Sequence, residues 1–332
     1  MGTGGTNRGR ENQRKHNIPQ PTTHNLNPQC QWTMDDNIRA FGACGAAVLY
    51  LMLSVTAIVS LFSPFLAKLA SHGKTRVVQV ESQDQDDDSI AGTKRSILSK
   101  ILRLLDHELL QIPKRYFSNF YSFGFTWSGY ILWNRSKNLA AVLLYLHLVR
   151  RFAECQYVHR WNGTMHLAGY ALGLLHYFLL PLMFQFYSNQ EMRYRVFGVL
   201  LNIYSQYNQY LHHSILASYR CQAQSNQRYS IPVGNWFQFI SCPHYLAEIL
   251  IYASFTILLH DDGQHDHEIV CDTGSHRRIA GICSLILPWR NCVFLTWVTI
   301  NLAVSARSTH AWYHKKFQAY PKKRRALIPC VW

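Results

Sequence analysis

Long stretches without charged side chains constrain this chain more than any other feature of its sequence. No Asp, Glu, Lys or Arg occurs between Arg39 and Lys68, and similar stretches recur toward the C-terminus. A helix needs about 20 mostly apolar residues to cross a bilayer. Charged residues make up 15% of the 332 residues, whereas about 25% is usual in soluble proteins. We therefore predict an all-α polytopic membrane protein with about seven transmembrane helices.

The charge and cysteine patterns exclude several classes of protein. The net charge is +15, but the basic residues cluster beside the apolar stretches, which indicates membrane lipids as partners and no nucleic acid. Nine cysteines are scattered without a C-x-x-C pair, so neither a zinc site nor a disulfide framework is indicated. The first apolar run begins near residue 40, and no cleavable signal peptide is predicted.

Composition divides the chain into four segments. Residues 1–37 are polar and without periodicity, as in a disordered tail. Residues 38–68 form the first predicted transmembrane helix. Residues 69–111 form a polar loop that ends in an amphipathic helix from Ser96 to Leu110, where apolar residues recur at three and four. Residues 112–332 form the main membrane domain.

Two polar runs invite a metal hypothesis. The aspartates from Asp86 to Asp88 lack the spacing of an EF-hand loop. The run H-D-D-G-Q-H-D-H-E from His260 to Glu268 has no fixed ligand geometry. We predict solvated loops at both places and no metal site.

The apolar run from Tyr245 to Leu259 contains Glu248, and it follows the turn-rich stretch that begins at Tyr229. His244 and Glu248 lie four residues apart and share one face of a helix. Ionisable groups at bilayer depth are costly, which favours a functional role. The alternative is a buried polar pair that joins two helices, and the spacing alone leaves both open.

Two further polar rows lie inside apolar segments. The first row comprises His147, Arg150, Arg151 and Glu154. Its spacing fits either an interfacial salt bridge at a helix end or phosphate capture beside an acid. The second row comprises Gln209, His213 and Arg220. These side chains fall near one helix face, which indicates a lined cavity, although a single polar residue in a span is often structural.

Four motifs carry a resemblance to a known family. The run from Ile231 to Tyr252 reads I-P-x-G-x-W-F-x-x-x-S-x-P-x-Y-L-A-E-x-x-I-Y. The others are P-K-R-Y-F-S-x-F-Y from Pro113, L-H-x-x-R-R-x-x-E-C-x-Y-V from Leu146, and H-x-x-Y-x-x-x-F-x-x-Y-P-x-x-R-x-A-x-x-P from His310. Across residues 112–332 the chain resembles the steroid 5α-reductase family, and within it the polyprenol reductase branch.

The resemblance implies NADPH, held between helices, because the chain has no G-x-G-x-x-G motif. His213 stands where the wider family has Asp, and the aromatic, basic tail from Arg307 is expected to fold over the cofactor. The cofactor-binding residues implied or chosen by chemistry are Arg150, Arg151, Gln209, His213, Arg220, Tyr229, His244, Glu248, His310, Tyr313 and Arg324.

The reaction implied by the resemblance is hydride transfer to the β-carbon of an α,β-unsaturated carbonyl, in the endoplasmic reticulum membrane. A hydrogen-bond or proton donor must meet the charge that develops on the carbonyl oxygen. The catalytic candidates are Tyr116, Tyr121, His147 and Glu154. Leu148 stands near the position of the tyrosine used by the steroid enzymes, which favours a polyprenyl lipid over a steroid as substrate.

Three alternatives accompany this hypothesis. The first is a reductase of 3-oxo-4-ene steroids. The second is a membrane methyltransferase of the isoprenylcysteine type, against which the first and last motifs argue. The third is a membrane adaptor without enzymatic activity, which leaves the rows of polar residues inside the spans unexplained.

Overall fold

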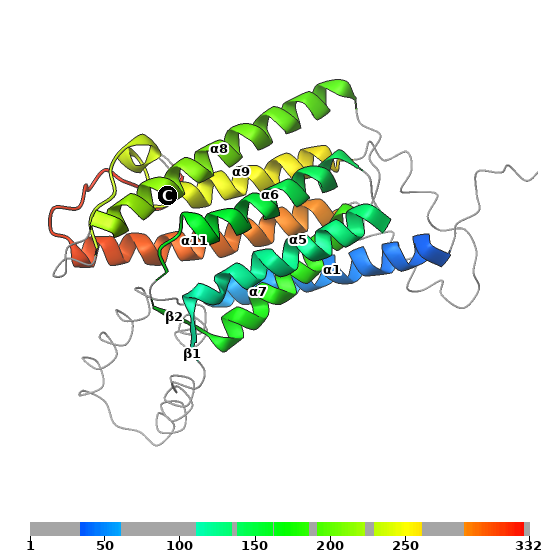
Figure 1. Ribbon diagram of the computed structural model, residues 1–332, viewed down its shortest axis with the longest axis horizontal. Coiled ribbons are helices and arrows are strands. Elements are labelled where there is room, and N and C mark those ends of the chain that lie inside the picture. Colours follow the sequence, from blue (N-terminus) through cyan, green and yellow to red (C-terminus); the bar gives the residue numbers. More distant parts are fainter. Residues whose placement is uncertain are drawn as a thin grey trace, which may run out of the picture.

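The computed structural model describes residues 34–60, 111–134, 138–161, 163–185, 191–222, 229–260 and 289–328. Within these ranges the α-helices are α1 (Met34–Ser60), α5 (Phe117–Asn134), α6 (Leu139–Tyr157), α7 (Leu167–Leu179), α8 (Met192–Gln222), α9 (Pro243–Leu258) and α11 (Arg290–Lys316). They run lengthwise in one elongated bundle (Figure 1). The predicted all-α class is confirmed apart from one small sheet.

That sheet was not expected from the sequence. Strand β1 (Gln111–Pro113) pairs antiparallel with β2 (Thr164–His166). The three-residue helix η3 (Lys114–Tyr116) follows β1, and α7 follows β2 directly. The sheet therefore holds the starts of α5 and α7 together at one end of the bundle (Figure 1).

Side-chain caps fix where two of the helices begin. The Asn138 carboxamide accepts a hydrogen bond from the Ala141 amide at 2.7 Å and starts α6. Its Nδ2 atom also donates to the Phe184 carbonyl at 2.7 Å, which ties α6 to η4 (Leu180–Phe184). His166 caps α7 in the same way, accepting from the Ala168 amide at 3.1 Å. Asn is among the strongest N-cap residues, whereas His is an uncommon one.

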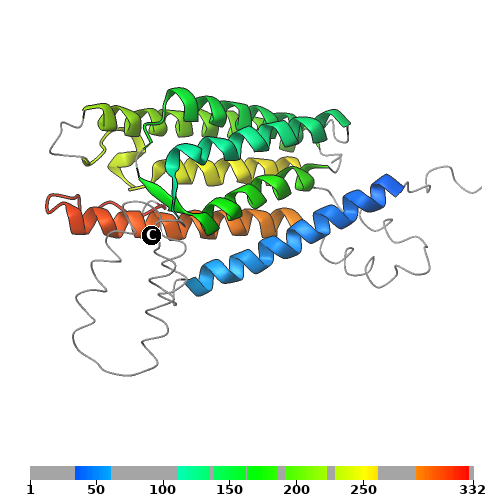
Figure 2. The same cartoon turned by 60° about the horizontal axis from the view of Figure 1, so that its bottom comes forward.

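Small residues let the helices approach closely. A Cβ atom on Gly198 would lie 2.7 Å from Leu258, so this glycine permits the contact of α8 with α9. A Cβ atom on Gly173 would lie 2.7 Å from the Phe120 ring, where α7 meets α5. Figure 2 shows α1 crossing α11 at an angle on one side of the bundle.

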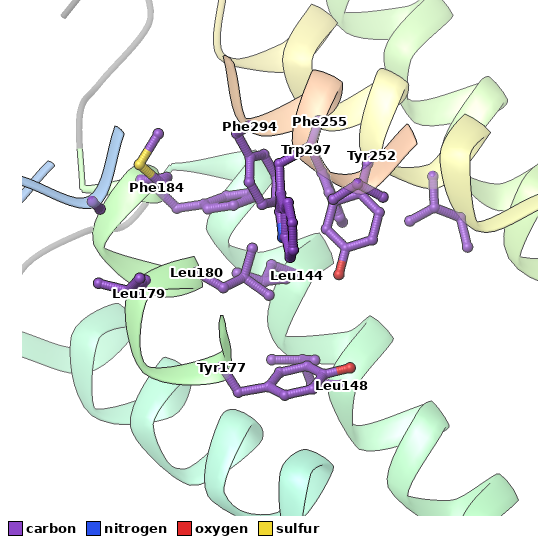
Figure 3. Close-up of a cluster of buried hydrophobic side chains, with 14 of the residues drawn as sticks. Leu144, Leu148, Tyr177, Leu179, Leu180, Phe184, Tyr252, Phe255, Phe294 and Trp297 are labelled. Atoms are coloured by element: carbon purple, nitrogen blue, oxygen red, sulfur yellow. The ribbon is translucent and has the colours of Figure 1, made fainter. Parts of the chain in front are cut away.

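An aromatic core joins the helices around these contacts (Figure 3). Tyr252 is 2% exposed, and its ring centroid lies 5.1 Å from that of Phe294. Tyr50, from α1, is fully buried against Phe294 at 5.1 Å and His176 at 5.8 Å. Helix α1 is therefore part of the core, although the family motifs begin only after residue 110.

Among the described residues, one helical stretch, Leu167–Phe184, is long and apolar enough to cross a membrane, with a mean hydropathy of 1.6. The apolar helix Gly42–Val55 is shorter. The seven spans therefore stay a prediction. The predicted tail up to residue 33, most of the polar loop with its amphipathic helix, and the loop from 261 to 268 lie outside the described residues.

Candidate active site

Helix α6 supplies the centre of the site, a carboxylate between two guanidinium groups. Glu154 is 2% exposed, and both Arg150 and Arg151 donate hydrogen bonds to its carboxylate. The spacings of three and four residues place all three side chains on one helix face. Their mutual contacts make an ion triad around a buried carboxylate, and both interpretations of this row stay open.

Helix α8 adds His213 and Gln209 to this triad. His213 Nδ1 lies 2.7 Å from Glu154 Oε2 and 2.8 Å from Arg151 Nη1. The Gln209 side chain accepts a hydrogen bond from Arg150 and donates one to Glu248. Gln209 therefore connects the centre of the site to a second carboxylate.

Helix α9 supplies that second carboxylate. The Glu248 side chain is 15% exposed, and its Oε1 lies 3.7 Å from His147 Nε2. The His244 ring lies 5.5 Å from the His213 ring, measured between centroids. His244 and Glu248 thus contact different partners on α8 and α6, which joins three helices in one polar network.

Tyr121, from α5, borders the network. Its hydroxyl accepts a hydrogen bond of 2.9 Å from Arg151 Nη2, and its ring lies under the same guanidinium at 4.8 Å. The Tyr177 ring packs edge-on against it, 5.2 Å between centroids. Because Arg151 occupies an acceptor position of the Tyr121 oxygen, the phenolic hydrogen is available to another acceptor.

Not every candidate residue joins this network. Tyr116 lies apart from it, 40% exposed and packed 5.3 Å from Arg115. Arg220 lies near the end of α8, where its Nη1 donates to the Arg160 carbonyl at 2.9 Å. Tyr116 and Arg220 therefore lie at the rim of the bundle near the sheet, outside the centre of the site.

The remaining candidates gather where the C-terminal segment packs on residues 229–241. Tyr313 stacks on Tyr320 with 5.1 Å between ring centroids and 9° between planes. Tyr229 meets Trp312 edge-on at 5.1 Å. A parallel bridge between Ile240 and Arg325 continues this contact. The tail therefore folds back over the loop that leads into α9.

Ser241 fixes this arrangement. Its hydroxyl lies 2.6 Å from His310 Nδ1, 2.6 Å from the Tyr320 hydroxyl and 3.1 Å from the Arg325 carbonyl. Arg324 is 4% exposed above the Tyr320 ring, and its Nε and Nη1 atoms have no hydrogen-bond partner. Buried donors of this kind are costly unless a further group binds them.

Three possible metal ligands converge at the Glu154 carboxylate, in the centre of the site. Atoms of Glu154, His159 and His213 lie within 4.8 Å of one another. Burial, and then the charge of Arg151, lower the pKa of His159 to about 4. Two guanidinium groups already bond the Glu154 carboxylate, so a divalent ion would be repelled by both.

The sequence does not predict three of the residues found at or near the site. His159 and Tyr177 lie outside the polar rows, and nothing in their local pattern marks them. Lys114 belongs to the P-K-R-Y motif, and its position beside Arg220 is a tertiary contact that sequence spacing does not reveal.

Comparison with known proteins agrees with the motifs. The family profile described as 3-oxo-5-alpha-steroid 4-dehydrogenase matches residues 168–263 and 281–332. The chain is 30% identical to a polyprenal reductase of Xenopus tropicalis, over 66% of this chain and 80% of that protein. It is 28% identical to those of Homo sapiens, over 66% and 77%, and of Danio rerio, over 76% and 89%. The chain therefore belongs to the steroid 5α-reductase family, in its polyprenal reductase branch, and is an oxidoreductase that acts on CH–CH bonds.

Proposed function

We propose that this protein reduces the α-isoprene double bond of a polyprenal with NADPH, as a step of dolichol biosynthesis that supports protein N-glycosylation. The single observation that carries the proposal is the hydrogen bond from Arg151 to Tyr121, beside a buried network of two carboxylates and two histidines. The names of the curated relatives point to the same substrate.

We propose the aldehyde as substrate because only its carbonyl can accept the negative charge that hydride addition creates. In an allylic alcohol, the double bond has no group that can accept electrons when a hydride arrives. In polyprenal, the same double bond is conjugated to a carbonyl, so hydride addition at the β-carbon gives an enolate. An enolate oxygen is a charge that positioned donors can stabilise. Alcohol and aldehyde would then be interconverted by another enzyme.

Tyr121 is the proposed donor to that oxygen. Its phenol can give a hydrogen bond or proton to the enolate oxygen, while Arg151 stabilises the charge left on the phenol. The enol then returns its oxygen proton to the Tyr121 phenolate while its α-carbon takes up one proton from solvent, which gives the saturated aldehyde and restores Tyr121. General acid catalysis of this kind contributes about 10²–10⁴-fold. Tyr116 is left out of this role because its side chain is 40% exposed and packs on Arg115. His147 and Glu154 are proposed to position Arg150 and Arg151.

The donor set fits a dinucleotide phosphate. When bound, reduced nicotinamide supplies the hydride. Gln209, His244 and Glu248 offer hydrogen bonds suited to an amide and a ribose. Arg324 offers two unpartnered, buried nitrogen atoms suited to a phosphate. We propose that the tail is held in place over the cofactor by His310, Tyr229 and Tyr313. Arg220 is proposed to bind the phosphates of the cofactor.

We also propose a multi-pass location in the endoplasmic reticulum, with the basic C-terminus in the cytosol. Seven spans would then place the N-terminus in the lumen. Protease protection of microsomes carrying a tag at either end checks this orientation. A C-terminal tag that resists protease without detergent would contradict it.

The test of the activity uses purified protein in phosphatidylcholine nanodiscs with NADPH deuterated at the transferred position. Polyprenal, polyprenol and a 3-oxo-4-ene steroid are supplied separately, and products are identified by mass spectrometry. We expect dolichal carrying deuterium at the β-carbon. Equal turnover of pure polyprenol with no aldehyde formed would contradict the substrate assignment. Binding of S-adenosylmethionine in place of NADPH would instead support the methyltransferase alternative.

A further inference from the structure

Lys114 is held at the rim of the bundle beside the sheet. Its amide donates a 3.0 Å hydrogen bond to the Gly163 carbonyl, just past the pairing of Pro113 with Thr164. The side chain is half-buried. The backbone of Lys114 is therefore fixed to the connection between α6 and β2.

A second cation is fixed to the same connection from the other side. Arg220 Nη1 donates to the Arg160 carbonyl at 2.9 Å. Burial, and then the charge of Arg220, lower the pKa of Lys114 to about 8. The two cations are thus close enough to repel each other, and in the described part of the chain neither forms an ion pair with a carboxylate.

Arg324 is a third cation, linked to Arg220 through Tyr313. Tyr313 lies within reach of the charges of both Arg220 and Arg324. Arg324 is 4% exposed, with its Nε and Nη1 atoms unpartnered. Lys114 is thus paired with Arg220, and Arg220 and Arg324 both act on Tyr313. Like charges held together away from water are unfavourable unless an anion binds.

We propose that Lys114 is a binding residue for a phosphate group of the dinucleotide cofactor, acting with Arg220 and Arg324. This inference rests on the proposed function, because it takes NADPH as the ligand. An ammonium suits a phosphate oxygen as a point charge, while the guanidinium groups can bind in a bidentate manner.

A phosphate ester at this rim has two sources, a lipid headgroup and the cofactor, and the geometry favours the cofactor. Gln209 and Arg220 both lie on α8, and at 1.5 Å per residue they are separated by about 16 Å. A nucleotide extended along α8 from the network at Gln209 would reach Arg220. Arg324 is 4% exposed, and a side chain so buried suits a bound cofactor better than a headgroup at the bilayer surface.

The proposal implies that cofactor affinity depends on pH. The charged group that acts on Lys114 is Arg220 from α8, and Arg115 is its neighbour in the chain. Arg220 in turn donates to the Arg160 carbonyl and acts on His159, both in the α6–β2 connection. His159 has a pKa of about 4, and the arginines remain charged, so Lys114 is the group that changes charge in the alkaline range. Free protein loses this charge near pH 8, and its affinity for phosphate should then fall.

The experiment measures the Kd of NADPH from pH 6.5 to 9.5 in phosphatidylcholine nanodiscs. Wild type should lose affinity above pH 8, whereas Lys114→Arg should hold its affinity across the range. Lys114→Gln should bind about 10- to 100-fold more weakly at pH 7, the effect of losing a charge-assisted contact. Arg193→Gln is the matched control, since it removes one positive charge from an exposed residue at the other end of α8.

The outcomes separate the inference from the proposed function. If wild type does not bind NADPH, the proposed function fails. If wild type binds but Lys114→Gln shares its Kd and pH profile, the inference alone is overturned. If Lys114→Gln changes only the response to added phosphatidylserine, the phosphate at Lys114 belongs to a lipid and the inference is again overturned. Chromatographic profiles and the Lys114→Arg variant show whether the protein remains folded.

Discussion

Arg151 both donates a 2.9 Å hydrogen bond to the Tyr121 hydroxyl and lies 4.8 Å from the centroid of its ring. One guanidinium therefore orients the phenol and stabilises any negative charge that forms on its oxygen. Such a pairing lets a residue with an ordinarily weak acid group donate to a developing enolate. The same guanidinium bonds Glu154, so the Tyr121 phenol and the buried carboxylate are held by one side chain.

Removal of the Tyr121 hydroxyl tests this assignment. Tyr121→Phe should lower kcat for polyprenal about 10²–10⁴-fold, the usual contribution of a general acid. The Kd of NADPH should change little, because the ring and its packing on Tyr177 remain. Tyr116→Phe is the matched control and should keep near wild-type kcat. An equal loss in both variants would contradict the assignment.

Loss of the central carboxylate should affect folding more than binding. Glu154→Gln leaves Arg150 and Arg151 without their anion, and breaking a buried ion pair on one side costs about 3–5 kcal/mol. Reversible unfolding in detergent measures this loss. Glu191→Gln, in an exposed pair with Arg193, should cost at most about 1 kcal/mol.

A double-mutant cycle measures how strongly Arg151 and Glu154 of this triad stabilise each other. Glu154→Gln combined with Arg151→Met should be less destabilised than the sum of the two single variants, because the second change removes the unpaired cation. Additive effects would show that Arg151 and Glu154 do not stabilise each other.

The space around Tyr177 allows a test of positioning. A Cβ atom on Gly124 would lie 2.9 Å from the Tyr177 ring, so Gly124→Ala should displace that ring from Tyr121. We expect a lower kcat with an unchanged Kd for NADPH. Gly45→Ala adds the same atom where nothing lies within 4 Å, and it should keep full activity. A normal kcat in Gly124→Ala would show that Tyr177 does not position Tyr121.

The contact of Ser241 with the C-terminal segment predicts a binding defect. Ser241→Ala removes contacts to His310 and Tyr320, and each neutral hydrogen bond contributes about 0.5–1.5 kcal/mol. NADPH affinity should weaken, and limited proteolysis should cut the tail faster. Ser305→Ala removes only a hydroxyl bonded within its own helix. Identical proteolysis of both variants would argue against this role for Ser241.

Lys114 also predicts how stability depends on pH in the cofactor-free protein. Its pKa is about 8 in the folded chain against an ordinary 10.5. Between these values the unfolded chain binds more protons than the folded chain. The contribution of Lys114 to the free energy of unfolding is therefore constant below pH 8 and rises from pH 8 to about 10.5. Thermal unfolding of wild type and Lys114→Gln should therefore differ progressively less from pH 8 to 10. A constant difference would show that Lys114 keeps its proton in the folded state.

The sequence predicts which polar side chains share one face of a helix better than it predicts which faces of different helices make contact. The spacing of His147, Arg150, Arg151 and Glu154 predicts one face, and all four join one network. Their partners Gln209 and Glu248 lie on other helices, and spacing carries no information on which faces meet. Only the family motifs linked these rows before the structure was known.

Other features lacked any local signal. The three-residue strands β1 and β2 are too short for a periodic pattern, and their pairing depends on where α5 and α7 begin. Tyr177 lies in an apolar run, where its hydroxyl gives no hint that it packs on Tyr121. Tyr116 and Tyr121 are equally plausible donors by sequence, and only burial and the contact with Arg151 separate them.

The contacts of Ser241 also bear on when this enzyme becomes active during its synthesis. Ser241 and Tyr320 lie 79 residues apart along the chain, yet their hydroxyls meet. The loop that leads into α9 therefore cannot reach its final form while residues 310–325 are still inside the ribosome. The active enzyme therefore forms only after residues 310–325 are released, so a ribosome stalled before that point would hold an inactive protein.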